Sequence, residues 1–278
     1  MADDSALRFG VVAGEASGDL LAGLLLKGLR QRWPSLPAAG IGGPRMAEQG
    51  FEAWWPHERL SVFGYVDALG RLPELLRIRR QLAERLLDER PAAFIGVDAP
   101  DFNFGLETRL RQAGIKTVHF VCPSIWAWRA HRVHKLARAA DHVLCLFPFE
   151  PALLQQHGIA ATYVGHPLAD AIPFDPPRAA ARAALGLAEA DQVIALLPGS
   201  RRSEIAQIAP RMAAAAALMH RDRAHLRLVL PAAPGLRPAV EAVLAQHAPG
   251  VPIQVIDGRS QQVLAACDVT LIASGTAT

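Results

Sequence analysis

A chain of 278 residues is long enough for two α/β domains or for one large domain. Hydrophobic residues make up 51% of it and charged residues 20%, a composition that excludes an intrinsically disordered chain. The formal net charge of +3 is too small to indicate a nucleic-acid partner.

The cysteines and the N-terminus indicate the compartment. Cys122, Cys145 and Cys267 are widely spaced and form no CxxC pair, so the sequence suggests neither a disulfide framework nor a zinc site. The segment MADDSALRFG carries acids where a signal peptide would carry positive charge. The longest apolar runs fall short of the ~18 residues that span a bilayer. We therefore expect a cytoplasmic protein, soluble or peripheral to a membrane.

Short apolar runs alternate with helix-length segments along the chain. We expect strands at residues 8–13, 93–97, 117–122, 142–147, 192–197, 227–230, 253–256 and 269–273. Helical periodicity predicts helices at residues 19–32, 69–89, 203–221 and 236–246. Continuous apolar strands separated by helices indicate parallel sheets that are covered on both faces. The predicted fold class is a doubly wound α/β architecture.

A proline-rich segment marks a domain boundary. Three prolines lie within residues 173–177, where they cannot continue a sheet, and a new strand begins at Gln192. We therefore predict a first domain at residues 1–170, a linker at 171–186 and a second domain at 187–278. The second domain is short for a mononucleotide-binding half, and the chain stops at SGTAT directly after a strand. We expect a chain truncated at its C-terminus.

Two loops that follow strands of the first domain carry candidate site residues. In VVAGEASGDLLAG, small residues around Glu15 and Ser17 let the backbone approach a polar ligand, with a plain turn capped by Asp19 as the alternative. In FIGVDAPDFNFGL, Asp98 follows an apolar run, at a cleft edge where a pKa can be tuned for general-base work. A structural hydrogen-bond acceptor is the alternative role for Asp98, and Asp101 is placed to cap the next helix.

A third loop combines aromatic and basic residues. In CPSIWAWRAHRVHK, Trp126 and Trp128 are followed by Arg129 and Arg132. These residues form a candidate wall that stacks on a sugar and contacts a phosphate or lipid headgroup.

The second domain carries two loops of small residues after strands. LLPGSRRSEIAQ places Gly199, Ser200 and Arg201 between a strand and a helix, a setting that suits a diphosphate. ASGTAT supplies the second loop after the last strand, with Ser274, Gly275 and Thr276. Together the two loops predict a nucleotide-diphosphate site.

Eight motifs in order along nearly the whole chain resemble those of the lipid-A-disaccharide synthases, inverting glycosyltransferases of the two-domain GT-B kind. The motifs are AGEASGD, GIGGPRM, FIGVDAPDFN, CPSIWAWR, LFPFE, VGHPLAD, LLPGSR and LIASGTA. The resemblance implies sugar transfer from UDP-2,3-diacylglucosamine to 2,3-diacylglucosamine 1-phosphate (lipid X). Transfer releases UDP and forms a β-1,6-linked disaccharide in the lipid A biosynthesis of Gram-negative bacteria. No metal or other cofactor is implied.

The resemblance also implies roles for residues of this chain. Asp98 matches the family's candidate general base, and Glu15, Ser17, Trp126 and Arg129 are expected to bind the acceptor. The fold implied is a pair of Rossmann-like domains, the second incomplete here, attached peripherally to the inner-membrane surface, with a homodimer as a further expectation. Because family members continue well beyond SGTA, we expect weak or absent UDP binding and no detectable transfer by this chain itself.

Three other functions are weighed against this one. A sugar-nucleotide epimerase shares the GT-B architecture but does not explain DAPDFN or CPSIWAWR. An inactive fragment that binds only membrane or acceptor is the second, and a lipid-binding module without a nucleotide site is the third. The motif LLPGSRR argues against the third.

Leucines on the segment 69–89 predict a membrane contact. At about 100° per residue they share one arc, which consists of Leu69, Leu72, Leu75, Leu76, Leu82, Leu86 and Leu87. Most such stripes belong to a protein core. Arg79 falls inside the arc, and both substrates implied by the resemblance are lipids, so we expect the stripe, and Leu69, Leu72, Leu75 and Leu76 above all, to face a membrane.

Overall fold

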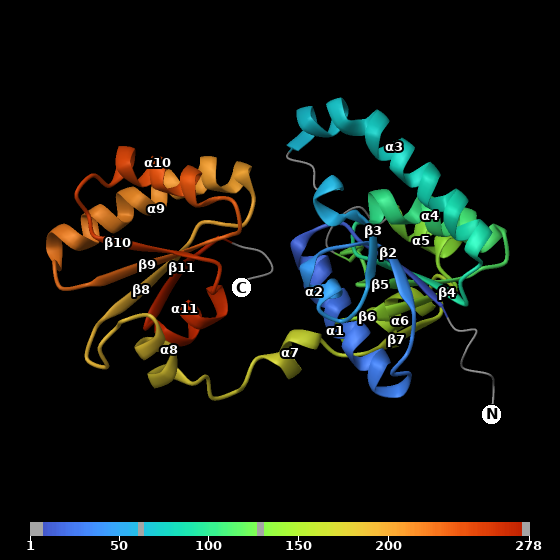
Figure 1. The fold of residues 1–278 in the computed structure, drawn as a ribbon, viewed down its shortest axis with the longest axis horizontal. Coiled ribbons are helices and arrows are strands. Elements are labelled where there is room, and N and C mark those ends of the chain that lie inside the picture. Colours follow the sequence, from blue (N-terminus) through green and yellow to red (C-terminus); the bar gives the residue numbers. More distant parts are fainter. Residues whose placement is uncertain (1–7, 61–63, 127–130, 274–278) are drawn as a thin grey trace. The chain divides into compact units, whose positions relative to one another are not determined.

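The computed structural model describes residues 8–60, 64–126 and 131–273 (Figure 1). The chain separates into two compact units, residues 1–62 with 66–172 and residues 63–65 with 173–278. Within the described residues, no helix is both long enough and apolar enough to cross a bilayer.

The first unit is built on a seven-stranded parallel sheet in the order β3-β2-β1-β4-β5-β6-β7. Its strands are β1 (Phe9–Ala13), β2 (Ala38–Gly42), β3 (Glu52–Pro56), β4 (Ala93–Val97), β5 (Lys116–Phe120), β6 (His142–Cys145) and β7 (Ala161–Tyr163). Its helices are α1 (Ala16–Arg32), α2 (Pro44–Ala47), α3 (Gly64–Glu89), α4 (Pro100–Gln112), α5 (Arg132–Ala139), α6 (Glu150–Gln155) and α7 (Pro167–Ala171), with a short 3-10 turn at His57–Arg59.

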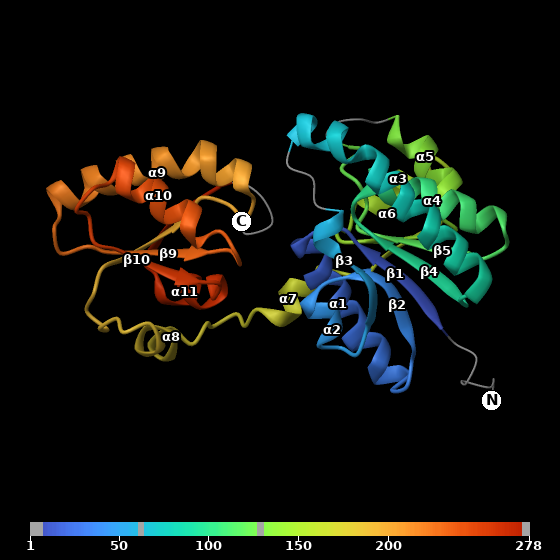
Figure 2. The same cartoon turned by 45° about the horizontal axis from the view of Figure 1, so that its top comes forward.

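Helices cover both faces of this sheet, as the continuous apolar strands predict. Leu21 and Leu26 of α1 pack on one face, against residues such as Val11 and Ile95. Leu82 of α3 and neighbouring residues of α4 pack on the other. Figure 2 shows α1 and α3 on opposite sides of the sheet. All loops that leave the carboxyl ends of the strands therefore open at one edge of the unit.

The second unit is a four-stranded parallel sheet in the order β10-β9-β8-β11. Its elements are α8 (Arg178–Ala184), β8 (Val193–Leu197), α9 (Arg202–Asp222), β9 (Arg227–Ala232), α10 (Arg237–His247), β10 (Ile253–Asp257), α11 (Ser260–Ala266) and β11 (Val269–Ile272). Helices α9 and α10 pack on one face, and α8 and α11 on the other (Figures 1 and 2). The doubly wound α/β class is thus confirmed.

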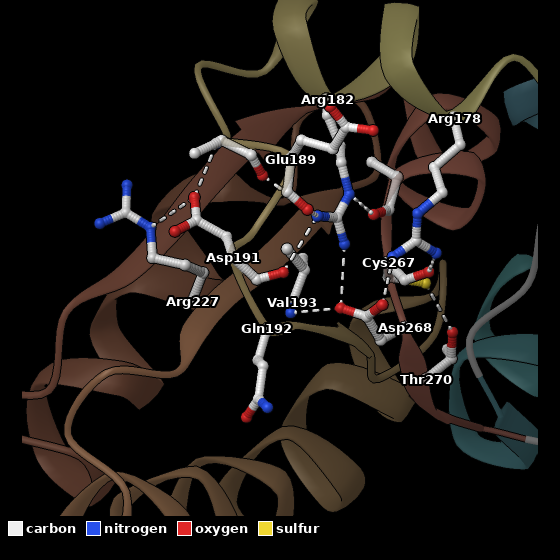
Figure 3. Close-up of polar contacts among 12 residues, drawn as sticks. Arg178, Arg182, Glu189, Asp191, Gln192, Val193, Arg227, Cys267, Asp268 and Thr270 are labelled. Carbon is white, nitrogen blue, oxygen red and sulfur yellow. Dashed lines mark hydrogen bonds and ion pairs between the residues drawn. The ribbon is translucent and has the colours of Figure 1, made fainter.

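Helix α8 is fastened to the second unit by a buried arginine (Figure 3). The Arg182 guanidinium is almost fully buried and donates to the backbone carbonyls of Ala266, Ala188, Glu189 and Asp191. It also donates to Asp268 Oδ2 at 2.9 Å. Arg182 thus bonds to carbonyls that precede β8 and to one that precedes β11. These hydrogen bonds hold α8 against the segments that lead into both strands.

Asp268 receives further donors in the same cluster (Figure 3). The Val193 N–H donates to Oδ2 at 2.8 Å, and the Arg178 guanidinium pairs with Oδ1. The Val193 N–H and the two arginines hold the pKa of this carboxyl below its usual range, against the effect of burial.

Three strands of the first unit were not predicted from the sequence. Strand β2 reads AAGIG, whose small residues carry little strand signal, and it contains Gly40 because a Cβ there would lie 2.3 Å from the Val11 carbonyl oxygen. Strand β3 reads EAWWP, with a charge and a proline at its ends, and β7 has only three residues. The ends of the other eight strands lie within two residues of the predicted ends.

The leucine stripe of α3 divides into two parts. Leu82 and Leu86 are fully buried in the core, so the membrane-facing prediction is wrong for them. Leu72 and Leu76 are each 46% exposed, whereas Leu75 and Leu87 are partly buried against the core. Arg79 interrupts the stripe because its guanidinium lies against Gly105 of α4. The side chain of Leu69 lies outside the described residues.

Candidate functional site

The loops after β1 and β4 meet at one edge of the first sheet. Ala13 pairs with Val97 in register, so Gly14 and Asp98 are the next residues of neighbouring strands. A Cβ added at Gly14 would lie 3.2 Å from the Ala99 Cβ, which shows how closely the loops pack. Glu15 and Ser17, at the start of α1, therefore lie at the same edge as Asp98.

Asp98 has an unusual backbone. Its φ is +50° and that of Ala99 is +44°, so two consecutive residues with side chains adopt the left-handed region. Such conformations cost on the order of 1–3 kcal/mol each and persist only where the surroundings impose them. Here the Asp98 N–H donates to the Phe120 carbonyl at 2.9 Å, and Asn103 Nδ2 donates to the Asp98 carbonyl at 2.8 Å. The strand thus ends in a sharp turn that presents Asp98 at the edge.

A buried polar layer lies beneath this turn. Asn103 of α4 is fully buried, and one helical turn further on Glu107 Oε1 lies 2.7 Å from His119 Nδ1 of β5. Glu107 and His119 are also fully buried. A Cβ at Gly96 would lie 2.1 Å from Glu107 Oε1, so the glycine makes room for the pair. No local sequence pattern points to Asn103, Glu107 or His119, because their roles depend on contacts between α4 and the sheet.

The structure corrects the expected roles of two acidic residues. Asp19 does not cap α1; its buried carboxylate accepts the N–H groups of Gly43 at 2.8 Å, Arg45 at 3.0 Å and Met46 at 3.2 Å. It therefore ties the GIGGPRM segment to α1. Asp101 makes no side-chain cap for α4, and instead both of its oxygens accept from Arg132 Nη2 at 2.7 Å.

The third expected loop contributes an exposed aromatic side chain. Trp126 is 51% exposed and packs edge-on against Phe149, with ring centroids 5.3 Å apart. Arg132, expected to contact phosphate, is paired with Asp101. Arg129 and Trp128 lie outside the described residues.

Two cysteines far apart in the sequence are neighbours in space. Within the described chain, Cys122, Cys145 and Glu150 bring three potential metal-ligating atoms within 4.8 Å of one another. The hydrogen bond with Cys145, together with burial, raises the pKa of the Cys122 thiol. Glu150 accepts the Phe147 N–H at 3.0 Å. The arrangement favours protonated thiols in a core over thiolate ligands to a metal.

The loop of the second unit that is predicted to bind a diphosphate is followed by an acid, Glu204, in the first turn of α9. Gly199 has a φ of +123° and lies against the Glu204 side chain. Glu204 Oε2 accepts the N–H groups of Ser200 at 2.8 Å and Arg201 at 3.1 Å, and Oε1 pairs with the Arg201 guanidinium at 3.2 Å. This carboxylate occupies donors that a phosphate would use.

The second expected diphosphate loop, Ser274, Gly275 and Thr276, lies outside the described residues. The strand before it is described: Ile272 pairs with Leu197, and the Ala273 N–H donates to the Leu197 carbonyl at 2.9 Å. Strands β8 and β11 are therefore neighbours whose carboxyl ends lie at the same edge of the sheet.

Comparisons with known proteins agree with this architecture. A family model described as lipid-A-disaccharide synthetase matches residues 9–278. The chain is 62% identical over 273 residues to the lipid-A-disaccharide synthase of Verminephrobacter eiseniae, covering 98% of this chain and 70% of that relative. It is 60% identical over 273 residues to that of Albidiferax ferrireducens, with the same two shares.

A solved structure shares the fold. The UDP-GlcNAc 2-epimerase of Neisseria meningitidis bound to UDP-GlcNAc has a TM-score of 0.65, with 97% of this chain and 78% of that chain covered. The sequence identity is 11%, so this likeness concerns the fold alone.

Proposed function

Because the chain belongs to the lipid-A-disaccharide synthase family, a family of glycosyltransferases, we propose that Asp98 is the general base of the sugar transfer. The acceptor is 2,3-diacylglucosamine 1-phosphate, and the donor is UDP-2,3-diacylglucosamine. The observation that carries the proposal is the strained turn at the carboxyl end of β4, which costs free energy and presents one carboxylate at the sheet edge. The epimerase alternative has only a likeness of fold.

The reaction requires a base because the 6-hydroxyl of the acceptor is a poor nucleophile. Its oxygen attacks the anomeric carbon of the donor while the bond from that carbon to the UDP oxygen breaks. The hydroxyl proton passes to the Asp98 carboxylate, and UDP leaves with the bonding electrons. Glu15 and Ser17 lie at the same edge and bind the acceptor sugar, with Trp126 and Arg129 as further contacts of the acceptor.

The second unit binds the nucleotide. Gly199, Ser200 and Arg201 hold the diphosphate at the start of α9, together with the loop at Ser274, Gly275 and Thr276. Support comes from the exposed Arg201 side chain and from the Ser200 and Arg201 N–H groups, which already hold one anion, the Glu204 carboxylate, that a diphosphate would have to displace. Stabilising the negative charge that develops on UDP lowers the barrier to its departure.

Contact with the inner membrane belongs to the same proposal. Leu72 and Leu76 are exposed on α3, and both substrates carry acyl chains that reside in a bilayer. Leu69 and Leu75 extend this surface in the proposal. Peripheral attachment would let the enzyme collect both lipids from the cytoplasmic leaflet. The homodimer stays a prediction.

The test of the base is Asp98→Asn. This change keeps the size of the side chain but removes its basicity, so turnover should fall by ~10² or more while the fold persists. Disaccharide formation measures turnover, in the chain extended to the length of its relatives where the 278-residue chain gives no product. Circular dichroism measures the fold. Asp101→Asn is the matched control, because Asp101 is an exposed carboxylate three residues away that pairs with Arg132. Near-normal turnover of Asp98→Asn would show that Asp98 has a structural role.

A further inference from the structure

Three aromatic side chains form an exposed surface on the first unit, which we call the aromatic platform. Trp126, Phe147 and Phe149 are 51%, 45% and 49% exposed. The Trp126 and Phe149 rings meet at 86° with centroids 5.3 Å apart, and the Phe147 and Phe149 rings stack at 14° with centroids 5.8 Å apart. The three rings therefore pack on one another while about half of each remains open to a ligand.

A buried carboxylate supports the platform from below. Glu150, the first residue of α6, is only 2% exposed, and its Oε2 accepts the Phe147 N–H at 3.0 Å. Burial raises the pKa of this carboxyl, whereas the Phe147 N–H and the Trp126 indole N–H favour its charged form. Glu150 thus interacts with two of the three platform residues, which come from the loops after β5 and β6.

The platform lies near the proposed base. Asp98 follows β4, the platform residues follow β5 and β6, and these three strands are neighbours in the sheet. Val97 pairs with Phe120, and Phe120 pairs with Leu144. Neighbouring strands lie about 4.8 Å apart, so roughly 10 Å separates the ends of β4 and β6. One sugar ring and the root of an acyl chain can bridge that span.

We propose that the aromatic platform binds an acyl chain of the acceptor lipid, and that Glu150 is the residue that positions the platform. This inference rests on the proposed function, because it assumes that the acceptor sugar lies beside Asp98. The chemistry fits a hydrocarbon: the exposed ring atoms are apolar, and contact with a chain removes apolar area from water on both partners. The hydroxyl that reacts and the chain that anchors the sugar are then held on neighbouring strands.

The first experiment identifies the residues that contact the acyl chain. An acceptor that carries a photoreactive diazirine at the end of one acyl chain is irradiated with the protein, and tryptic peptides are sequenced by mass spectrometry. The adduct should fall in residues 117–129 or 139–178, and its fragment ions should locate it at Trp126, Phe147 or Phe149. Phe149→Ser should reduce labelling at least tenfold, because Phe149 contacts both other rings.

Phe174→Ser is the matched control, because Phe174 is a fully exposed phenylalanine in the same tryptic peptide but outside the platform. It should label like the unchanged protein. An adduct elsewhere in the chain, or equal labelling of Phe149→Ser, would overturn the proposal. Phe147→Ser provides a second variant in case Phe149→Ser fails to fold.

The second experiment separates the platform from the sugar site. Acceptors with successively longer acyl chains are titrated into the protein below their aggregation concentrations. Affinity should rise by up to about fourfold for each methylene that becomes buried, the equivalent of 0.8 kcal/mol. Phe149→Ser should flatten this dependence on chain length and leave the shortest acceptor almost unaffected. Phe174→Ser should keep the dependence.

The role of Glu150 is tested in the same titration. Glu150→Gln keeps the shape and an acceptor oxygen for the Phe147 N–H, so it should retain the dependence on chain length. Glu150→Leu should lose it while the protein stays folded. Unchanged dependence in Phe149→Ser and Glu150→Leu would overturn the platform but not the sugar site. Absence of binding by every acceptor would instead overturn the acceptor assignment, and the platform with it.

Discussion

Asp98 depends on a neighbour that does no chemistry itself. The Asn103 side-chain amide donates to the Asp98 carbonyl and lies fully buried below the two left-handed residues. A carboxylate that must meet a hydroxyl within hydrogen-bond reach tolerates little displacement, because misplacement by about 1 Å can cost 10²-fold in rate. Asn103 therefore sets the position of the base through the backbone.

We expect Asn103→Ala to lower kcat by roughly tenfold or more and to leave KM for both substrates nearly unchanged. Loss of a buried hydrogen bond should also lower the free energy of unfolding by about 1–3 kcal/mol. Thr108→Ala is the control, because Thr108 Oγ1 donates to the Phe104 carbonyl on the same helix but away from the turn. An equal loss of kcat in Thr108→Ala would attribute the effect to α4 as a whole.

Glu204 and a diphosphate compete for the same N–H groups. Gln at this position still caps a helix start but carries no charge. We therefore expect Glu204→Gln to bind UDP roughly fivefold more tightly, from about 1 kcal/mol of relieved repulsion at a solvent-exposed site. Calorimetric titration measures the affinity for UDP, and Glu241→Gln on α10 controls for the change in net charge. Weaker UDP binding by Glu204→Gln would place the diphosphate elsewhere.

Helix α3 serves two environments with one repeating pattern. Leu82 and Leu86 lie in the core, while Leu72 and Leu76, about two to four turns earlier, remain exposed. Helical periodicity places all four leucines on one arc, so the sequence predicts an amphipathic helix. It does not predict which turns of the helix lie over the sheet and which extend past it. The core half of the stripe could only be recognised from tertiary contacts.

The exposed half gives a prediction. The double variant Leu72→Ser and Leu76→Ser should lose binding to lipid vesicles while its free energy of unfolding changes by less than about 1 kcal/mol. Vesicle sedimentation and chemical denaturation measure the two quantities. Leu82→Ala should do the opposite, with a loss of about 2–5 kcal/mol and no direct effect on vesicle binding. Undiminished vesicle binding by the double variant would remove α3 from the membrane proposal.

Sequence reasoning succeeded for elements whose signal is local. The apolar run at residues 93–97 predicted β4 at both of its ends, and it led to Asp98 because this polar residue directly follows the run. The prediction that Asp19 caps α1 was wrong because the partners of its carboxylate, Gly43 to Met46, lie more than 20 residues away in the chain. Cys122 and Cys145 became neighbours only through the pairing of β5 with β6. Contacts of this kind depend on strand order, which no local pattern contains.

At the scale of the whole molecule, acid should weaken the second unit through the loss of one carboxylate, that of Asp268. The pKa of Asp268 in the second unit is lowered by the Val193 N–H, Arg178 and Arg182. Its folded pKa lies below its unfolded value of about 3.9, so its contribution to stability is present above that value. The contribution is lost as the pH falls through the folded pKa.

Thermal unfolding between pH 7 and pH 2 tests the contribution of the Asp268 charge to stability. We expect Asp268→Asn to lower the transition temperature of the second unit at pH 7, and the difference from the unchanged protein to shrink below about pH 4. Asp222→Asn should show little difference at any pH, because Asp222 is an exposed carboxylate paired only with its neighbour Arg221 among the contacts described. A difference for Asp268→Asn that persists at the lowest pH would show that its charge is not the cause.

The position of β1 in the first sheet has a consequence for synthesis of the protein. This strand leaves the ribosome before its two neighbours, β2 and β4, and Val11 and Val12 of it are fully buried. Its second neighbour does not exist until Val97 has been translated, roughly ten seconds later at ordinary elongation rates. During that interval, the backbone N–H and C=O groups on one side of this apolar strand have no partner strand. Chaperones that bind nascent chains are therefore expected to bind Phe9–Ala13 during that interval.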